Sequence, residues 1–255
     1  MVETIKSLVY ARSGDYAANR AAMLALVDEL NERQTWARAG GGERGARKFR
    51  EAGKLLPRER VELLLDPGTP FLELSPLAAY SMYNNESPAA SQIVGIGVVS
   101  GVECLIFAND ATVKGGAVYP MTLQKSLRAQ QIAFENRLPC ISLVESAGAN
   151  LLYQDEVFIL GGRTFANQAR LSAAGIPQVA LVFGSSTAGG AYIPGMSDYV
   201  VMVRNQAAVY LGGPPLVKMA IGEESDDETL GGAEMHAHTS GVSDYTAEND
   251  ADALR

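Results

Sequence analysis

Two adjacent glycines in a run of small residues, Gly189 and Gly190, are the positions in this sequence best suited to chemistry. They follow an apolar run, residues 178–183, whose length and composition predict a buried β-strand. Glycine has no Cβ to hold a ligand away, so a turn here can offer bare N–H groups. If a helix begins at this turn, its first amides lack internal partners and favour negative charge. The pattern predicts an oxyanion hole, and a tight structural turn is the alternative for the pair taken alone.

Three other segments have the same form, an apolar run followed by a turn of small residues. They cover residues 105–116, 140–150 and 208–215. Ligands of open α/β sheets bind at the carboxyl ends of the strands. We therefore expect the turns to line one cavity.

Side chains that commonly act as catalysts are scarce. His236 and His238 are the only histidines, and neither lies near a serine or cysteine nucleophile motif. The sequence contains no metalloprotease, CxxC, Walker A or dinucleotide-binding pattern. Chemistry would therefore rest on main-chain donors that stabilise an oxyanion, and an enolate formed from a thioester meets that requirement.

The composition is that of an ordinary globular protein. The chain has 255 residues, of which 47% are hydrophobic and 20% charged, and no apolar stretch has the length of a membrane span. Residues 1–6 lack the pattern of a secretion signal. Cys104 and Cys140 lie in apolar runs and are expected to be reduced core thiols. These features predict a cytoplasmic protein, or a mitochondrial matrix protein if a transit peptide has been removed.

Charge is unevenly distributed along the chain. The net charge of −8 argues against nucleic acid as a partner. Residues 38–60 are rich in arginine and lysine, whereas residues 223–252 are acidic and contain neither. The basic segment suits a small ligand that carries phosphates, and solvated helix faces are the alternative.

The periodicity of apolar residues predicts an alternation of strands and helices, which indicates an α/β fold with right-handed crossovers. A long amphipathic helix with Asp15 as its N-cap precedes this region, and residues 76–91 are expected to form a surface loop. The predicted helices are 15–38, 57–65, 120–136, 160–175 and one from about 190. The predicted strands are 93–99 and 103–108, which form a hairpin, and 140–144, 178–183, 199–203 and 207–211.

Five motifs in order resemble the carboxyltransferase (beta) subunit of biotin-dependent acyl-CoA carboxylases of the methylcrotonoyl-CoA, geranyl-CoA and propionyl-CoA type. They are residues 109–116, 145–149, 154–158, 187–192 and 210–218. The resemblance implies a crotonase-like ββα superhelix, with a carboxyltransferase N-terminal domain over 38–255 that follows a helical extension over 1–37. It also implies transfer of a carboxyl group from carboxybiotin to an acyl-CoA by way of a thioester enolate.

The resemblance assigns roles to particular positions. Gly189 and Gly190 correspond to the oxyanion-hole pair of the family. The positions that correspond to the acyl-CoA cavity are Ser146, Ala147, Gly148, Ala149, Ala188, Gly212 and Gly213. From the basic segment, Lys54 and Arg58 are expected to meet the CoA phosphates. Two departures leave the acyl group open: Glu145-Ser146-Ala147-Gly148-Ala149 replaces the usual Asp-Ser-Gly-Gly-Ala, and the segment after Phe158 is short.

The implied partners are an acyl-CoA substrate, a biotin carboxylase or biotin carrier subunit, and a C-terminal carboxyltransferase domain or second chain. A homo- or hetero-oligomer is implied, with no metal in this chain and no membrane. Since family members carry two such domains, we expect this chain alone not to turn over. The alternatives are a crotonase-type CoA-thioester hydrolase or isomerase, with Glu145 or Glu156 as its base, and a non-catalytic CoA-binding or assembly module.

Overall fold

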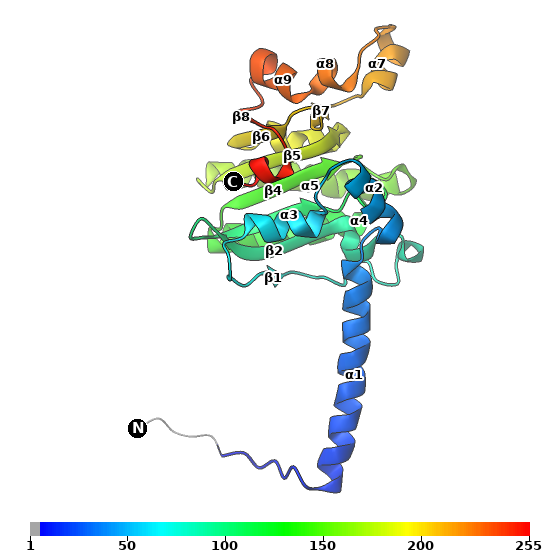
Figure 1. Ribbon diagram of the computed structural model, residues 1–255, viewed down its shortest axis with the longest axis vertical. Helices are drawn as coiled ribbons and strands as arrows, with labels where there is room; N and C mark the ends of the chain where they lie inside the picture. Colours follow the sequence, from blue (N-terminus) through cyan, green and yellow to red (C-terminus); the bar gives the residue numbers. More distant parts are fainter. Residues whose placement is uncertain (1–5) are drawn as a thin grey trace.

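The computed structural model describes residues 6–255, and within them eight strands form one mixed sheet (Figure 1). The order across the sheet is β1-β2-β3-β4-β5-β6-β8, and β7 pairs with β5. The strands are β1 (Leu72–Glu73), β2 (Gln92–Val99), β3 (Val102–Asn109), β4 (Cys140–Ser146), β5 (Gln178–Thr187), β6 (Tyr199–Val203), β7 (Ala208–Tyr210) and β8 (Tyr245–Ala247). Residues 1–5, part of the stretch considered for a secretion signal, lie outside the described residues.

Strand pairing confirms the predicted hairpin and the α/β class. β2 and β3 are antiparallel and pair from Gln92↔Asn109 to Val99↔Val102. From β3 onward, β4, β5, β6 and β8 pair in parallel. Because parallel strands end at the same edge, the turns after β3, β4 and β5 are brought together there.

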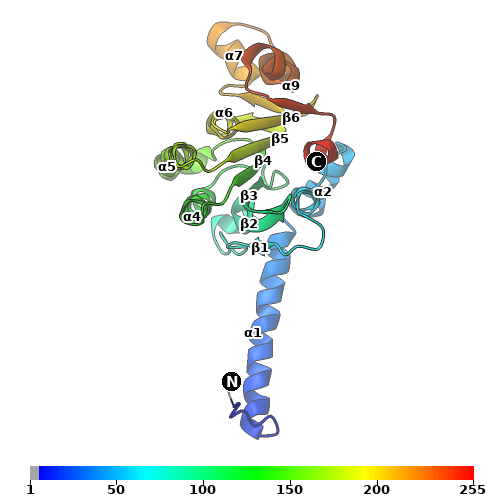
Figure 2. The ribbon, with the colours of Figure 1, turned by 90° about the vertical axis from the view of Figure 1, so that its left-hand side faces the viewer.

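Helices cover both faces of the sheet (Figure 2). α4, α5 and α6 lie on one face, and α2, α3 and α10 lie on the other. The helices are α1 (Gly14–Arg38), α2 (Gly42–Glu51), α3 (Pro57–Leu64), α4 (Pro120–Asn136), α5 (Gln154–Ala173), α6 (Tyr192–Gly195), α7 (Pro214–Ile221), α8 (Asp227–Gly231), α9 (Ala233–Met235) and α10 (Asp250–Ala253). Short 3-10 turns at Tyr83–Asn85, Pro88–Ser91, Leu151–Tyr153 and Ala188–Ala191, and a π-turn at His236–Ser240, complete the chain.

The alternation of side chains along β4 assigns each face of the sheet to a core. Ile141 and Leu143 pack in the cluster that also contains Val61 and Phe183, on the α3 face. Cys140 packs on the other face, beneath α4 and α5. Both faces of the central strands are therefore buried, and the free, buried thiols of Cys104 and Cys140 confirm their assignment to the core.

The long helix α1 projects away from the sheet (Figure 1). Its contact with the domain lies near its carboxyl end, where Trp36 packs edge-on against Tyr80 and Ala37 is buried. The predicted N-cap was wrong: Ser13, not Asp15, accepts the hydrogen bond from the amide of Tyr16. Since α1 runs to Arg38, the expected domain boundary at 37/38 stays a prediction.

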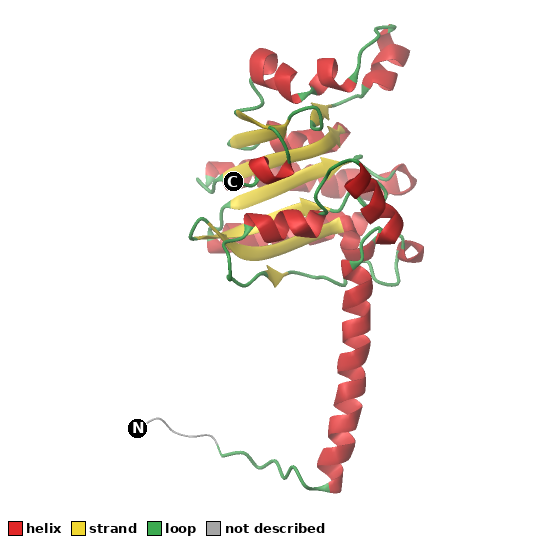
Figure 3. Ribbon diagram, viewed as in Figure 1, coloured by secondary structure: helices red, strands yellow, loops and turns green. Residues whose placement is uncertain are grey.

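Three other expectations need correction; Figure 3 marks helices, strands and loops in the view of Figure 1. The segment 76–91 is not a surface loop throughout, because Ser87 to Ser91 are buried against α4. α5 begins at Gln154, not at 160. β5 continues to Thr187, and the helix expected from about 190 is a 3-10 turn followed by the single turn of α6. No helix within residues 6–255 is both long and apolar enough to cross a membrane.

Candidate active site

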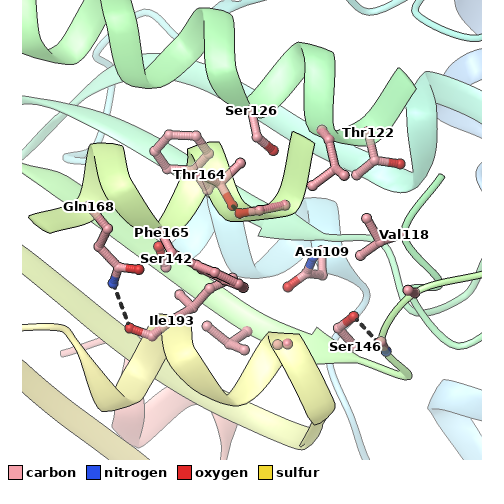
Figure 4. A pocket seen from close by; sticks show the side chains of 18 of the residues that line it. Asn109, Val118, Thr122, Ser126, Ser142, Ser146, Thr164, Phe165, Gln168 and Ile193 are labelled. Carbon is pink, nitrogen blue, oxygen red and sulfur yellow. Dashed lines mark hydrogen bonds between the residues drawn. The ribbon is translucent and has the colours of Figure 1, made fainter. Parts of the chain in front are cut away.

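A cavity of about 390 Å³ lies between the sheet and helices α4 and α5 (Figure 4). Its floor is formed by side chains of β3 and β4, and α6 closes one side. The predicted residues Ser146, Ala147, Gly148, Ala149, Ala188, Gly189 and Gly190 all line it. The turns after β4 and β5 therefore meet at one cavity, as the strand-then-turn pattern predicts.

The turn after β4 is fixed by hydrogen bonds to the turn that comes after β3. The Ser146 hydroxyl donates to the carbonyl of Gly116 at 2.9 Å and accepts from the amide of Gly148 at 3.1 Å. The amide of Ala147 donates to the carbonyl of Gly115 at 2.9 Å. Gly148 has φ of +85°, a conformation that favours glycine. The small residues thus form a rigid edge to the cavity.

The turn after β5 carries Gly189 and Gly190 within the 3-10 turn Ala188–Ala191, which no side chain caps. The first amides of such a turn have no acceptor within it. An added Cβ on Gly189 would lie 3.4 Å from the ring of Phe165, and one on Gly190 would lie 3.3 Å from Oγ of Ser186. Both glycines therefore bring bare main chain to the cavity, and their role as an oxyanion hole stays a prediction.

The Ser186 hydroxyl beneath this turn is fully buried, and it has no hydrogen-bond partner within the described residues. It lies on the cavity face of β5, since Ala180 and Val182 on the same face pack with Val144. The hydroxyl is not part of the cavity lining, and it packs directly behind Gly190.

The rest of the cavity wall is uncharged. Among its lining residues, all within the described chain, there is no lysine, arginine, histidine, aspartate or glutamate. The glutamine side chains of the wall are held by other groups: Gln168 donates to the carbonyl of Ile193 at 2.8 Å, and Gln178 donates to the carbonyl of Gln168 at 2.9 Å. Burial raises the pKa of the Cys140 thiol to about 12, so this lining thiol stays neutral.

Several residues expected at the site lie elsewhere. Gly212 and Gly213 come after β7 and are outside the cavity lining. Glu145 is on the opposite face of β4, and Glu156 is exposed on α5. The structure therefore places neither candidate base at the cavity.

Lys54 and Arg58 also lie on the opposite face of the sheet. Lys54 pairs with Glu145 at 2.7 Å, and Arg58 forms a two-pronged pair with Glu73 at 2.9 and 3.0 Å. Both cations have carboxylate partners away from the cavity, so the structure lends no support to their binding CoA phosphates, and that role stays a prediction.

Sequence reasoning missed the wall that α4 and α5 contribute. The missed residues include Ser126, Thr164, Phe165, Gln168 and, from α6, Ile193 (Figure 4). One available signal was the pair Gly161–Gly162 within α5, because paired glycines are unfavourable inside a helix unless space beside them is needed. Both glycines line the cavity.

Comparison with known proteins identifies the family. A family model described as "Carboxyl transferase domain" matches residues 48–255. The chain belongs to this family. The match leaves α1 outside it and includes both turns at the cavity.

Individual relatives agree with that assignment. The chain is 60% identical over 233 residues to the biotin-dependent 3-methylcrotonyl-coenzyme A carboxylase beta1 subunit of Mycobacterium tuberculosis, covering 90% of this chain and 44% of that protein. It is 52% identical over 246 residues to the mitochondrial methylcrotonoyl-CoA carboxylase beta chain of Dictyostelium discoideum. That match covers 95% of this chain and 42% of that protein. The chain thus spans about half the length of the curated relatives it matches.

Solved structures of the family have the same fold. The crystal structure of the P. aeruginosa geranyl-CoA carboxylase beta subunit matches with a TM-score of 0.89 and 51% identity, over 99% of this chain and 47% of that one. A transcarboxylase 12S structure with methylmalonyl-coenzyme A and methylmalonic acid bound matches with a TM-score of 0.84 and 29% identity. That match covers 91% of this chain and 46% of the transcarboxylase chain. The predicted crotonase-like α/β fold is confirmed.

Proposed function

We propose that this chain is the acyl-CoA-binding part of the carboxyltransferase of a biotin-dependent acyl-CoA carboxylase. The observation that carries the proposal is the uncapped Gly189–Gly190 turn at the end of an uncharged cavity. The beta-subunit names of the relatives support the reaction class, and their methylcrotonoyl-CoA and geranyl-CoA names support a branched acyl group.

In this reaction the thioester oxygen lies at the amides of Gly189 and Gly190. When the acyl group loses a proton from a carbon conjugated with the thioester, which is the γ carbon in a methylcrotonoyl group, negative charge moves onto that oxygen and the amides stabilise it. Since the cavity lining within 6–255 has no charged base, the proton would go to the ureido group of biotin once its carboxyl group has left. The uncharged wall excludes water and lowers the local dielectric, which strengthens these hydrogen bonds. The carbanion character of the enolate then allows its carbon to bond to a carboxyl group, which carboxybiotin supplies when a carrier protein brings it.

The cavity wall beside this turn sets the acyl class. An added Cβ on Gly161 or Gly162 would meet no atom within 4 Å, so α5 leaves open space at both positions. We infer that the site takes an apolar, branched acyl group, with room beyond the carbons next to the thioester.

The reaction involves two oxyanions, one on the thioester and one on the ureido group of biotin. The residues that line the cavity within 6–255 supply one glycine turn of this kind. The proposal therefore includes a second carboxyltransferase domain, on the same polypeptide or another, together with a biotin carrier and an oligomeric assembly. The compartment, cytoplasm or mitochondrial matrix, stays a prediction.

Transfer of labelled carboxylate tests the proposal against its alternatives. With carboxybiotin, a C-terminal carboxyltransferase domain and a panel of acyl-CoAs, the chain should incorporate label into the acyl-CoA. A hydrolase or isomerase would consume acyl-CoA without label, and a binding module would leave it unchanged; either result contradicts the proposal. The absence of a carboxylate in the cavity lining of the described chain already disfavours the hydrolase.

A further inference from the structure

On the other face of the sheet from the cavity lies a group of buried and half-buried charged and polar side chains that the proposed reaction does not use. We call Lys54, Arg60, Glu145, Gln206 and Asp250 the rear charge cluster. Arg60 is 2% exposed, and it donates to Glu145 at 2.8 Å and to Asp250 at 2.8 Å. Glu145 also accepts from Lys54 at 2.7 Å, and Asp250 accepts from Gln206 at 2.6 Å.

The cluster lies at an irregularity in the pairing of β4 with β5. Val144 pairs with Val182 and Ser146 pairs with Ser186. Between these pairs, the single residue Glu145 on β4 faces the three residues 183–185 on β5. Such a bulge bends the strand that carries the extra residues and redirects the chain beyond it. Here the chain beyond the bulge runs through Thr187 into the Gly189–Gly190 turn.

The side chain of Glu145 fills the space that this bulge creates. A Cβ added to Gly184 would lie 2.5 Å from Oε1 of Glu145 and 2.6 Å from its Cγ. The glutamate therefore occupies the position that a side chain at 184 would take. Gly184 allows the close approach because it has no side chain.

The same cluster supplies partners for the main chain of the bulge. The carbonyl of Phe183 accepts hydrogen bonds from Nζ of Lys54 at 3.0 Å and from Nε2 of Gln206 at 2.8 Å. The guanidinium of Arg60 lies 4.4 Å from the centre of the Phe183 ring. Side chains from three separate segments thus hold one residue of β5.

Stability alone is a weak explanation for this arrangement. Burying charges costs solvation that their pairing does not always recover, and apolar replacements of buried pairs are often at least as stable. One use of such groups is to fix a single geometry. Arg60 illustrates the cost, because its Nη2 has no partner within the described residues.

We propose that Glu145 is a positioning residue, whose carboxylate, held by Lys54 and Arg60, fixes the bulge of β5 and so sets the Gly189–Gly190 amides opposite Ser146. The catalytic meaning of this role rests on the proposed function. Glu145 does not touch the substrate in this account, because its side chain is on the face of the sheet away from the cavity. It acts through the main chain of residues 183–187.

The test compares Glu145→Gln with a matched control, Glu73→Gln. Both glutamates are 13% exposed and pair with an arginine on the same side of the sheet, but Glu73 lies on β1, away from the bulge. Hydrogen exchange of residues 183–191 should become faster by about tenfold in Glu145→Gln and should not change in Glu73→Gln. With the full carboxylase assembled, kcat should fall by about tenfold or more in Glu145→Gln, while the Kd for acyl-CoA stays within about twofold.

Exchange of residues 183–191 at the wild-type rate in Glu145→Gln, with unchanged kcat, would overturn the proposal, as would an equal change in Glu73→Gln. If the wild-type assembly transfers no carboxyl group, the proposed function fails, and the exchange measurement still decides whether Glu145 holds the bulge.

Lys54→Met is a second variant in case Glu145→Gln does not fold. It removes one donor to Glu145 and one to Phe183 but leaves the pair between Arg60 and Glu145. Faster exchange over 183–191 with an unchanged Kd for acyl-CoA supports the positioning role. A weaker Kd with unchanged exchange would overturn it and assign Lys54 to the ligand.

Discussion

Replacement of Gly190 by valine perturbs the proposed oxyanion hole with little effect elsewhere. Gly190 does not have positive φ, so its main chain accepts an L-residue without strain. The valine Cβ would lie 3.3 Å from Oγ of Ser186 and 3.8 Å from Cβ of Ser146. These contacts are tight but not overlapping, and the two further methyl groups would enter the space that the thioester oxygen needs.

The valine keeps its N–H, but its methyl groups keep the thioester oxygen from reaching the donor, so the expected effect is that of one lost hydrogen bond. Removal of a single oxyanion-hole hydrogen bond typically lowers kcat by about a hundred- to a thousandfold, or roughly 2.7–4 kcal/mol. We expect a loss of this order for Gly190→Val in labelled carboxyl transfer by the assembled carboxylase. The thermal midpoint should fall only slightly, since the 3.3 Å contact with Oγ of Ser186 needs a small shift and the rest of the side chain has the open cavity beside it.

Gly195→Val is the matched control for this experiment. Gly195 ends the short helix α6, lies outside the cavity lining, and a Cβ added there meets no atom within 4 Å. The rate of carboxyl transfer by Gly195→Val should therefore be near that of the wild type. Full activity of a well-folded Gly190→Val protein would refute the assignment of the oxyanion hole to this turn.

Three further predictions concern the cavity wall and the charged groups around it. Gly161→Leu should fill the space beside α5 and lower kcat/KM for long branched acyl-CoAs about tenfold more than for short ones, because the long acyl groups lose a few methylene contacts. Equal losses of kcat/KM across the acyl-CoA panel would contradict the cavity assignment. Arg58→Ala should lower the thermal midpoint and leave the Kd for CoA unchanged, because Arg58 pairs with Glu73. Weaker CoA binding would instead support a contact between Arg58 and the CoA phosphates. Burial lowers the pKa of Lys125 from 10.5 to about 8. Between pH 8 and pH 10.5 the unfolded chain therefore binds more protons than the folded chain, and the free energy of unfolding should rise with pH. Denaturant titration should show this rise in the wild type and not in Lys125→Met.

The elements that the sequence predicted well are those with a strong local pattern. The hairpin of β2 and β3 and the strand before Gly184 were predicted from apolar runs bounded by turn residues. The Gly189–Gly190 turn was found because paired glycines after a strand have a direct physical meaning. The family resemblance then assigned Ser146 to Ala149 to the same cavity, where the structure places them.

The parts that could not be predicted depend on three-dimensional contacts. Residues 76–91 are polar and rich in turn formers, yet Lys125 and Thr122 of α4 accommodate them by donating to the carbonyls of Ala89 and Ala90. The roles of Lys54 and Glu145 depend on which face of β4 meets the cavity. Strand periodicity predicts that the two faces alternate but does not assign either face to the cavity, so Glu145 stayed a candidate base for the alternative hydrolase. Lys54 was expected at the CoA phosphates because of its basic segment, and its pairing with Glu145 is a long-range contact that the sequence does not show.

Carboxyl transfer by the mixed components decides whether this chain supplies the acyl-CoA half of a carboxyltransferase site. Labelled carboxybiotin and a branched acyl-CoA would be incubated with this chain, with a C-terminal carboxyltransferase domain, and with both. We expect labelled acyl-CoA when both are present, none with either alone, and loss of label with Gly190→Val. Label that forms at full rate with this chain alone, or that persists unchanged in Gly190→Val, would contradict this expectation.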